Sequence, residues 1–384
     1  MLTSGIKFKG FGVKKKYKIV NKLFQLLLKQ KNEVIKSLGK SYNYSYKKTN
    51  LNKYKRFSNI RVIGMGGSTL GSQAIYDFLR HKTKKNFSFI DNLQNFNRIK
   101  HKKNLLNLII SKSGNTIETI VNANIIVKKK EKNIFITENK NNYLNNLAQN
   151  LKSEIIHHNN FIGGRFSVLS EVGMIPAELM GFSQSKFKQY NNLIKNKRFI
   201  NSLISNVNST LFFIKKKKFN SIILNYDEKA ENFFYWYQQL IAESLGKDKI
   251  GLLPIVSKMP KDNHSVMQLY LDGFQNNFFT FFFVKESNSS KINNKDILKM
   301  QNYLKNKDVN KIIYAQKIAT EKVFIKKNIP FRSFEIDKRD EKTIGELFCF
   351  FILETILLGR ALKLNPFDQP AVELIKTQTK KLLI

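Results

Sequence analysis

From residue 59 onward, the chain alternates short apolar runs with longer stretches that have the periodicity of a helix. Glycine or hydroxyl residues often separate an apolar run from the helical stretch that follows it. Strands that are apolar on both faces and alternate with helices are typical of a parallel sheet covered by helices. The pattern therefore predicts an α/β fold. The predicted strands are residues 60–63, 107–111, 133–137, 221–226, 278–284, 311–314 and 332–336, and the predicted helices are residues 17–38, 69–79, 116–128, 230–245, 343–363 and 370–382.

The alternation restarts near residue 221, after a polar stretch rich in Asn, Ser and Lys between residues 181 and 219. Two α/β units in tandem fit this restart and the length of 384 residues, since a domain commonly has about 150 residues. We therefore expect an N-terminal arm at residues 1–55 and a first doubly wound parallel-sheet subdomain at residues 56–200. A second such subdomain, at residues 201–384, would end in a helical C-terminal segment.

The chain is strongly basic, with 67 Lys and Arg against 28 Asp and Glu and a formal net charge of +39. Such a charge could indicate binding to nucleic acid or to an anionic membrane. However, 58 of the basic residues are lysines, and they are scattered over the whole chain. The lysine runs at 14–16, 128–130 and 215–218 lack the interleaved arginines and aromatics of a nucleic-acid site. We therefore expect compositional drift and no specific nucleic-acid partner; selected binding of a polyanion is the alternative.

Several other classes are excluded by what the sequence lacks. No apolar run approaches the roughly 18 residues of a membrane helix, and residues 1–30 have no signal-peptide pattern, so we expect a soluble, intracellular protein. The single cysteine, Cys349, excludes an intrachain disulfide and a Cys-based zinc cluster. The adjacent pair His157 and His158 lacks the i, i+4 spacing of zinc ligands on a helix. We therefore expect no metal.

A glycine-rich segment at residues 64–71 follows the first predicted strand and opens a helix. Backbone N–H groups at such a position can bind an anion, which makes Gly67 and Ser68 candidate substrate contacts. The segment is not a dinucleotide fingerprint, because Thr69 stands where the third glycine would be. A purely structural turn is an equally good interpretation.

A second loop, at residues 111–119, also follows a strand and opens a helix; we call it the hydroxyl loop. Hydroxyls and amides at a helix N-terminus suit a dianionic phosphate. Helix capping is the alternative, but four hydroxyls with a glycine and a lysine exceed what one cap needs. The sequence therefore favours phosphate binding here. The candidate residues are Ser111, Lys112, Ser113, Thr116 and Thr119.

The hydroxyl loop resembles the Ser/Thr loop with which sugar isomerase (SIS) domains hold sugar phosphates. Further segments resemble the glucose-6-phosphate isomerase family: GGRFSVLS at 163–170, QLIAESLGK at 239–247, DNH at 262–264 and FDQPAVELIK at 367–376. They occur in the order of that family. The resemblance implies tandem SIS subdomains, a sugar-phosphate substrate and a homodimer with shared active sites. It also implies cofactor-free isomerisation of glucose 6-phosphate and fructose 6-phosphate, and a cytoplasmic location. Glu171, where small residues or proline are commoner, and the short chain depart from the family pattern.

The resemblance also implies catalytic roles. Glu243 maps onto the base that moves a proton between C2 and C1 through a cis-enediol. Arg165 would stabilise the negative charge on the enediolate oxygens. His264 and Lys376 would open the sugar ring, and we expect His264 to enter the neighbouring subunit's site from a projecting loop at residues 251–260. The alternatives are a helix-surface carboxylate for Glu243 and a solvated charge in a glycine turn for Arg165.

The remaining candidates would hold the substrate. Gln239 lies one helical turn before Glu243 and so faces the same side of the helix. Gly164 precedes Arg165 and permits close approach, and Gln369 belongs to the C-terminal signature. The histidines outside the matched segments are expected to be surface or capping residues; these are His81, His101, His157 and His158.

Three other functions stay open at this point. A dual phosphoglucose/phosphomannose isomerase would also convert mannose 6-phosphate. A non-catalytic SIS sensor would bind a sugar phosphate without turnover. The third hypothesis, a polyanion-binding protein, is supported only by the net positive charge.

Overall fold

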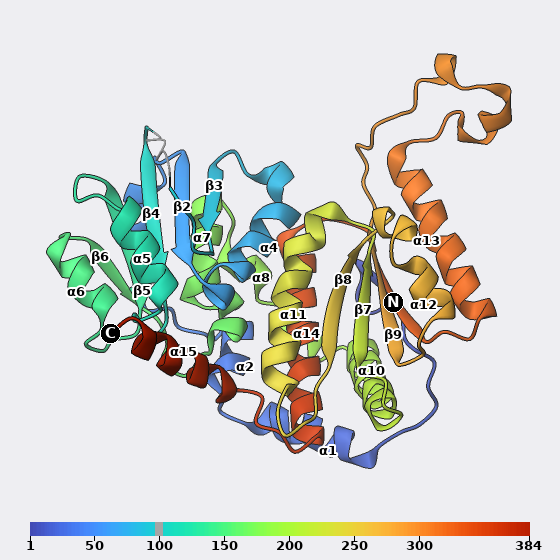
Figure 1. Ribbon diagram of the computed structural model, residues 1–384, viewed down its shortest axis with the longest axis horizontal. Coiled ribbons are helices and arrows are strands. Elements are labelled where there is room, and N and C mark those ends of the chain that lie inside the picture. Colours follow the sequence, from blue (N-terminus) through green and yellow to red (C-terminus); the bar gives the residue numbers. More distant parts are fainter. Residues whose placement is uncertain (97–102) are drawn as a thin grey trace.

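Two five-stranded sheets lie side by side in the computed structural model, which describes residues 1–96 and 103–384 (Figure 1). The first sheet is wholly parallel, with the strand order β3-β2-β4-β5-β6. Because the order reverses between β2 and β4, the carboxyl ends of these two strands open a crevice, the usual ligand position in such sheets. The strands are β2 (Asn59–Gly64), β3 (Asn86–Ile90), β4 (Leu105–Ile110), β5 (Lys132–Thr137) and β6 (Glu154–His157).

Helices cover both faces of the first sheet, because its central strands are apolar on both sides. Ile63, Ile109 and Phe135 pack against α5 and α6, whereas Val62 and Leu108 belong to the large core that includes α4 and α7. The bounds are α4 (Leu70–Phe78), α5 (Ile117–Ile126), α6 (Tyr143–Asn150) and α7 (Glu171–Met180).

The second sheet repeats this plan, with the order β1-β10-β9-β7-β8. Its four C-terminal strands are parallel, and the N-terminal β1 pairs antiparallel with β10. The predicted N-terminal arm thus supplies a strand to the second unit. The strands are β1 (Ile6–Lys9), β7 (Asn220–Asn225), β8 (Leu253–Lys258), β9 (Asn277–Val284) and β10 (Phe331–Ile336).

Two long helices, α11 and α14, lie between the two sheets (Figure 1). Almost every residue of α14 is buried, and α11 contacts both α14 and the first unit's α4. The core is therefore continuous across the two units. The remaining helices are α1 (Lys18–Lys29), α2 (Glu33–Leu38), α3 (Lys48–Leu51), α8 (Gln184–Phe187), α9 (Tyr190–Leu193), α10 (Lys197–Lys215), α11 (Glu231–Leu245), α12 (Met267–Asp272), α13 (Val309–Lys326), α14 (Glu341–Ala361) and α15 (Ala371–Leu382). No helix in the described part of the chain is long and apolar enough to cross a membrane.

Some predicted elements are wrong. Residues 311–314 are not a strand but the first turns of α13, which begins where the Asp308 side chain accepts a hydrogen bond from the Lys311 amide at 2.9 Å. Residues 17–38 form two helices rather than one, because Asn32 caps a new helix, α2. The polar stretch between residues 181 and 219 contains α8, α9 and α10.

Residues 251–260 are also not simply a projecting loop, since they contain the strand β8. The sequence missed four strands, β1, β3, β6 and β8, and each is an edge of its sheet. Edge strands are partly exposed to solvent and therefore lack the continuous apolar run that marks a central strand.

His158 is not a surface residue, in contrast to the prediction; its side chain is buried between residue 162 and Glu171. His158 Nε2 donates to the Ile162 carbonyl at 2.9 Å, and Nδ1 lies 3.9 Å from Glu171 Oε2. Burial lowers the pKa of His158 to about 4. His101 lies outside the described residues.

We predict a measurable acid sensitivity from this buried imidazole. The folded-state pKa lies below the ordinary value of 6.5, so His158 stabilises the fold fully above pH 6.5 and loses that contribution as the pH falls to 4. The loss corresponds to about 3 kcal/mol. Urea unfolding of the wild type and of His158→Gln between pH 4 and 7 should show a flatter pH dependence for the variant. Equal slopes would contradict the prediction.

Candidate active site

Two glycine turns from different parts of the first unit touch each other backbone to backbone. One is the turn Gly66–Ser68 after β2, and the other is the turn Gly164–Leu169. A Cβ atom on Gly67 would lie 2.2 Å from the carbonyl carbon of Gly164, so only glycine fits at residue 67. This contact brings the first glycine segment beside Arg165. Close packing accounts for the glycine at residue 67, whereas a Cβ atom on Gly164 would meet only Gly67 Cα at 3.8 Å. Roles of Gly67, Ser68 and Gly164 in substrate binding stay predictions.

The hydroxyl loop lies at the carboxyl end of β4, beside the crevice. Ser111 Oγ and Thr116 Oγ1 are 2.8 Å apart, and Ser113 Oγ accepts a hydrogen bond from the Asn115 amide at 3.2 Å. Thr116 stands at the N-cap of α5, yet its side chain makes no capping hydrogen bond. Thr119 is buried, and its Oγ1 has no hydrogen-bond partner among the described residues. This arrangement differs from what capping alone would produce.

Lys112 does not point freely at the loop. Its Nζ lies 3.4 Å from Glu138 Oε1, so the lysine is already paired in this structure. The hydroxyls of Ser111, Ser113 and Thr116 and the first amides of α5 are therefore the stronger phosphate candidates, because Thr119 Oγ1 is buried.

Replacing Ser113 and Thr116 together with Ala is expected to raise KM for fructose 6-phosphate far more than it lowers Tm. Each lost hydrogen bond to a charged partner is worth about 1.5–3 kcal/mol, or roughly 10- to 150-fold in affinity. Steady-state kinetics and thermal melts on the same preparation separate the two effects. A collapse of Tm with unchanged KM among the surviving molecules would mean that the hydroxyls serve only the fold.

Arg165 is the centre of the candidate site, and the residue is only 2% exposed. Nε donates to Ser244 Oγ at 2.8 Å, and Nη1 donates to Glu243 Oε2 at 3.1 Å and to Gln369 Oε1 at 2.6 Å. Nη2 donates to two backbone carbonyls, Pro366 O at 2.8 Å and Asp368 O at 2.9 Å. Burial lowers the pKa of Arg165, and the Glu243 carboxylate opposes that effect. The guanidinium is thus a fixed buried cation, not a solvated charge in a turn.

Glu243 and Gln239 lie near the C-terminal end of α11, one turn apart on the same face. Glu243 Oε1 accepts a hydrogen bond from Gln239 Nε2 at 2.9 Å, and Gln239 Oε1 has no partner among the described residues. The Glu243 side chain is 32% exposed. It lines a cavity of about 560 Å³ together with Gln369 and the start of α15. The carboxylate is therefore both held by Arg165 and open to a small molecule.

The structure does not bring the other two predicted catalytic residues to this cluster. Lys376 lies on α15, which has no buried residue, and among the described side chains only Glu373 pairs with it, at 2.6 Å. His264 lies in the turn Lys261–His264 after β8 and is exposed.

Within the same chain, His264 is at the opposite end of the second unit from Glu243. Lys258 at the end of β8 pairs with Glu231 at the start of α11 at 2.6 Å, and Pro254 near the start of β8 accepts from Gln238 at 2.8 Å. Helix and strand are therefore antiparallel. The six residues of β8 span roughly 20 Å, which separates His264 from Glu243 by a similar distance.

A model of the phosphoglucose isomerase family matches residues 31–257, more than half of the chain. The chain belongs to the phosphoglucose isomerase family. Relatives include the glucose-6-phosphate isomerase of Methanocaldococcus jannaschii, 33% identical over 351 residues that cover 84% of each chain. The Campylobacter jejuni glucose-6-phosphate isomerase is 31% identical over 346 residues, 85% of each chain.

Solved structures show the same fold. A hypothetical protein from Thermus thermophilus superposes with a TM-score of 0.82 at 20% identity, over 95% of this chain and 94% of that chain. A glucose-6-phosphate isomerase from Chlamydia trachomatis superposes with a TM-score of 0.70 at 18% identity, over 91% of this chain and 72% of that chain. The predicted fold class, two tandem SIS-type α/β units with a helical C-terminal segment, is confirmed.

The sequence signatures of the phosphoglucose isomerase family thus meet in space, but the sequence missed the residues that fix them. Trp236 Nε1 donates to the Arg165 carbonyl at 3.1 Å, and Ser244 accepts from the guanidinium. Both stand in or beside the matched segment at 239–247. Only a three-dimensional structure shows that they contact Arg165.

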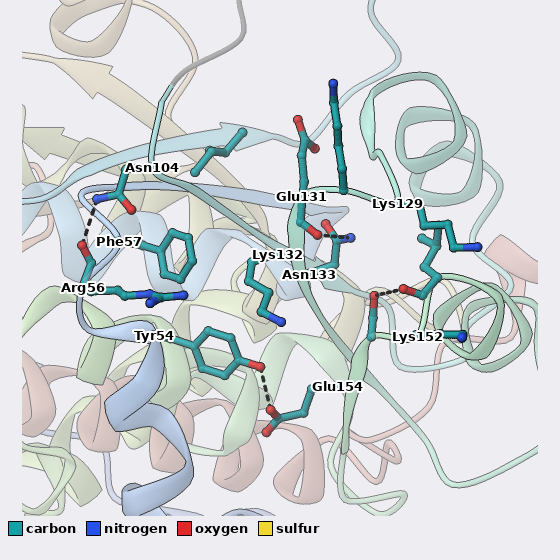
Figure 2. A pocket seen from close by; sticks show the side chains of 14 residues that line it. Tyr54, Arg56, Phe57, Asn104, Lys129, Glu131, Lys132, Asn133, Lys152 and Glu154 are labelled. Carbon is teal, nitrogen blue, oxygen red and sulfur yellow. Dashed lines mark hydrogen bonds between the residues drawn. The ribbon is translucent and has the colours of Figure 1, made fainter.

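A second cavity, of about 580 Å³, lies away from this site at the amino ends of β4, β5 and β6 (Figure 2). Figure 2 shows Arg56 and Lys132 extending toward it beside Tyr54, whose hydroxyl donates to Glu154 at 2.6 Å. None of the predicted site residues lines it. Ligands of doubly wound sheets bind at the carboxyl ends of the strands, and we assign no part of the reaction to this cavity. In the described part of the chain, no group of three His, Cys, Asp or Glu residues could hold a metal ion.

Proposed function

We infer that this chain catalyses the reversible isomerisation of glucose 6-phosphate and fructose 6-phosphate. The observation that carries this conclusion is the 3.1 Å contact between Arg165 and Glu243. Glu243 lines a cavity, and both residues stand in segments that match the phosphoglucose isomerase family. A carboxylate beside a fixed cation is the pair that proton transfer through an enediol needs.

In the proposed mechanism, the hydroxyl loop binds the phosphate. Glu243 takes the proton from C2 of the open-chain sugar, and the electron pair left behind forms the C1–C2 double bond of the cis-enediol while O1 gains a proton. Return of the proton from Glu243 to C1, with loss of the O2 proton, gives the ketose. Arg165 stabilises the negative charge on the enediolate oxygens because its guanidinium is already fixed and largely desolvated. Gln239, one helical turn before Glu243 and hydrogen-bonded to it, would contact the sugar or the phosphate.

Ring opening would require His264 and Lys376, and both assignments rest on the family resemblance. Because β8 separates His264 from Glu243 by roughly 20 Å, the two residues of one chain are too far apart to act on the same substrate molecule. A two-fold dimer could place each exposed His264 in the partner's site and so build two identical shared sites. We therefore propose a homodimer. We also propose that the protein acts in the cytoplasm, in glycolysis and gluconeogenesis, and that it has no specific nucleic-acid partner.

A coupled assay of fructose 6-phosphate conversion to glucose 6-phosphate tests the function directly. Conversion by the purified chain supports the proposal. Binding of fructose 6-phosphate without turnover would overturn it in favour of a sugar-phosphate sensor. A parallel assay with mannose 6-phosphate separates a dual phosphoglucose/phosphomannose isomerase from one restricted to glucose and fructose 6-phosphates.

A further inference from the structure

The loop between α14 and α15 supplies most of the groups that hold Arg165. Two of its backbone carbonyls, Pro366 O and Asp368 O, accept from Nη2, and the Gln369 side chain accepts from Nη1. The orientation of the guanidinium toward Glu243 therefore depends on the conformation of residues 365–369, which we call the arginine loop.

One ammonium group ties the arginine loop to the helix that carries Glu243. Lys247 lies two residues beyond the end of α11, and its Nζ donates to the Asn365 carbonyl and lies 2.7 Å from Asp368 Oδ1. The same Nζ lies 3.3 Å from the Ser244 carbonyl. Asp368 Oδ2 in turn accepts from Asn365 Nδ2 at 2.8 Å. Lys247 thus joins both ends of the arginine loop to the end of α11.

The burial of Lys247 sets it apart from most lysines of this basic chain. Its side chain is 11% exposed, whereas that of Lys258, which pairs with Glu231 at the other end of α11, is 51% exposed. A lysine side chain with so little exposed surface, whose ammonium contacts three acceptors at once, is restricted in its geometry. The ion pair between Lys258 and Glu231 is an exposed contact of ordinary strength.

We propose that Lys247 is a positioning residue for Arg165: by fixing the arginine loop, it holds the guanidinium against Glu243 in the orientation that the enediolate requires. This inference rests on the proposed role of Arg165 in the isomerisation. Lys247 lines the same cavity as Glu243, but its ammonium is engaged by Ser244, Asn365 and Asp368, so it acts through the loop and no role in binding the phosphate is assigned to it. Its loss should therefore lower kcat and leave KM nearly unchanged.

The kinetic test compares Lys247→Met with Lys258→Met, the matched loss of a lysine ion pair at the other end of α11. We expect kcat for fructose 6-phosphate to fall about 10- to 100-fold in Lys247→Met with KM within about threefold, the pattern of an interaction used in the transition state. Lys258→Met should keep wild-type kcat within about twofold. Unchanged kcat in Lys247→Met, or an equal loss in both variants, would overturn the proposal.

A second variant guards against a folding defect. Asp368→Asn removes the carboxylate but keeps the Asp368 backbone carbonyl, and the side chain is 52% exposed, so the fold should survive. We expect a smaller loss of kcat in the same direction. The double variant should be no worse than Lys247→Met alone, because the carboxylate acts through its pair with Lys247 and the amide oxygen of Asn can still accept from Asn365. If the losses of kcat in the two single variants add fully in the double variant, the proposal is overturned. If Lys247→Met fails to fold, a wild-type kcat in Asp368→Asn overturns it.

A spectroscopic readout separates this inference from the proposed function. The chain has a single tryptophan, Trp236, and its indole N–H donates to the Arg165 carbonyl. The indole N–H resonance should shift in Lys247→Met and stay unchanged in Lys258→Met, whether or not the protein is an isomerase. If the wild-type protein has no isomerase activity but the indole resonance shifts in Lys247→Met, the proposed function is refuted and the positioning role is retained. If the wild-type protein is an active isomerase but the indole resonance does not shift in Lys247→Met, only the positioning role is refuted.

Discussion

Replacing Glu243 with Gln is expected to abolish isomerisation while leaving sugar-phosphate binding largely intact. The amide keeps the shape of the side chain and an oxygen that can accept from Arg165, but it cannot take a proton from carbon. The new amide nitrogen would face Gln239 Nε2, so the Gln239 amide must turn over to present Oε1, which has no partner among the described residues; with that turn the local packing should survive. Because this carboxylate would carry both proton transfers, we expect kcat to fall by at least about 10³-fold, within the range for general acid–base catalysis.

The measurement follows the release of deuterium from C2 of labelled glucose 6-phosphate, together with the Kd of the sugar phosphate by calorimetry. Glu231→Gln, on the same helix but at its other end, is the matched control and should exchange at the wild-type rate. Residual exchange near wild type in Glu243→Gln would remove the carboxylate from the reaction. Loss of binding in parallel with exchange would instead assign Glu243 to substrate affinity.

Two inactive variants, Glu243→Gln and His264→Ala, are expected to recover activity when they are unfolded and refolded together. If each site combines Glu243 of one subunit with His264 of its partner, a mixed dimer has one site with both defects and one with neither. Random reassortment makes about half of the dimers mixed, so about a quarter of wild-type activity should return. Activity of the co-refolded mixture, compared with the two variants refolded separately, measures the effect.

The control pairs Glu243→Gln with Arg165→Lys. These two residues are in contact within one chain, at 3.1 Å, so every site in a mixed dimer keeps one defect and the mixture should stay inactive. A refolded mixture of Glu243→Gln and His264→Ala that is shown to contain mixed dimers and remains inactive would rule out the shared site.

The sequence predicted the central strands well and the edges of the sheets poorly. Strands such as β4 and β9 are buried on both faces, which leaves a mostly apolar run in the sequence, interrupted only by Asn107 in β4 and by Asn277 and Thr280 in β9. The edge strand β8 has the burial pattern of a partly exposed segment and begins with the exposed Leu253, so its sequence resembles that of a loop. The apolar run at residues 311–314 belongs to α13, because a run of four residues fits one turn of a helix as well as a strand.

The candidate site divides in the same way. Motif spacing within one helix placed Gln239 and Glu243 on one face, and the structure joins them at 2.9 Å. Sequence patterns could also mark Arg165 and Gln369, but not their contact, because they are separated by 204 positions along the chain. The family resemblance predicts that Lys376 acts beside Glu243, but among the described residues the two make no contact; Lys376 pairs with Glu373 instead. For Lys112, the structure shows a pairing with Glu138 that the sequence did not indicate.

By itself, the sequence determined the fold class, the tandem arrangement and the segments in which the chemistry resides, because burial periodicity and short motifs are local properties of the chain. Only the tertiary structure decided which residues of those segments come into contact and which stay apart. The packing of Gly67 against Gly164, and of α11 against both α4 and α14, fixes Arg165 beside Glu243. The antiparallel run of α11 and β8 likewise sets His264 far from Glu243 in the same chain. Both depend on contacts between residues distant in sequence, which no local pattern encodes.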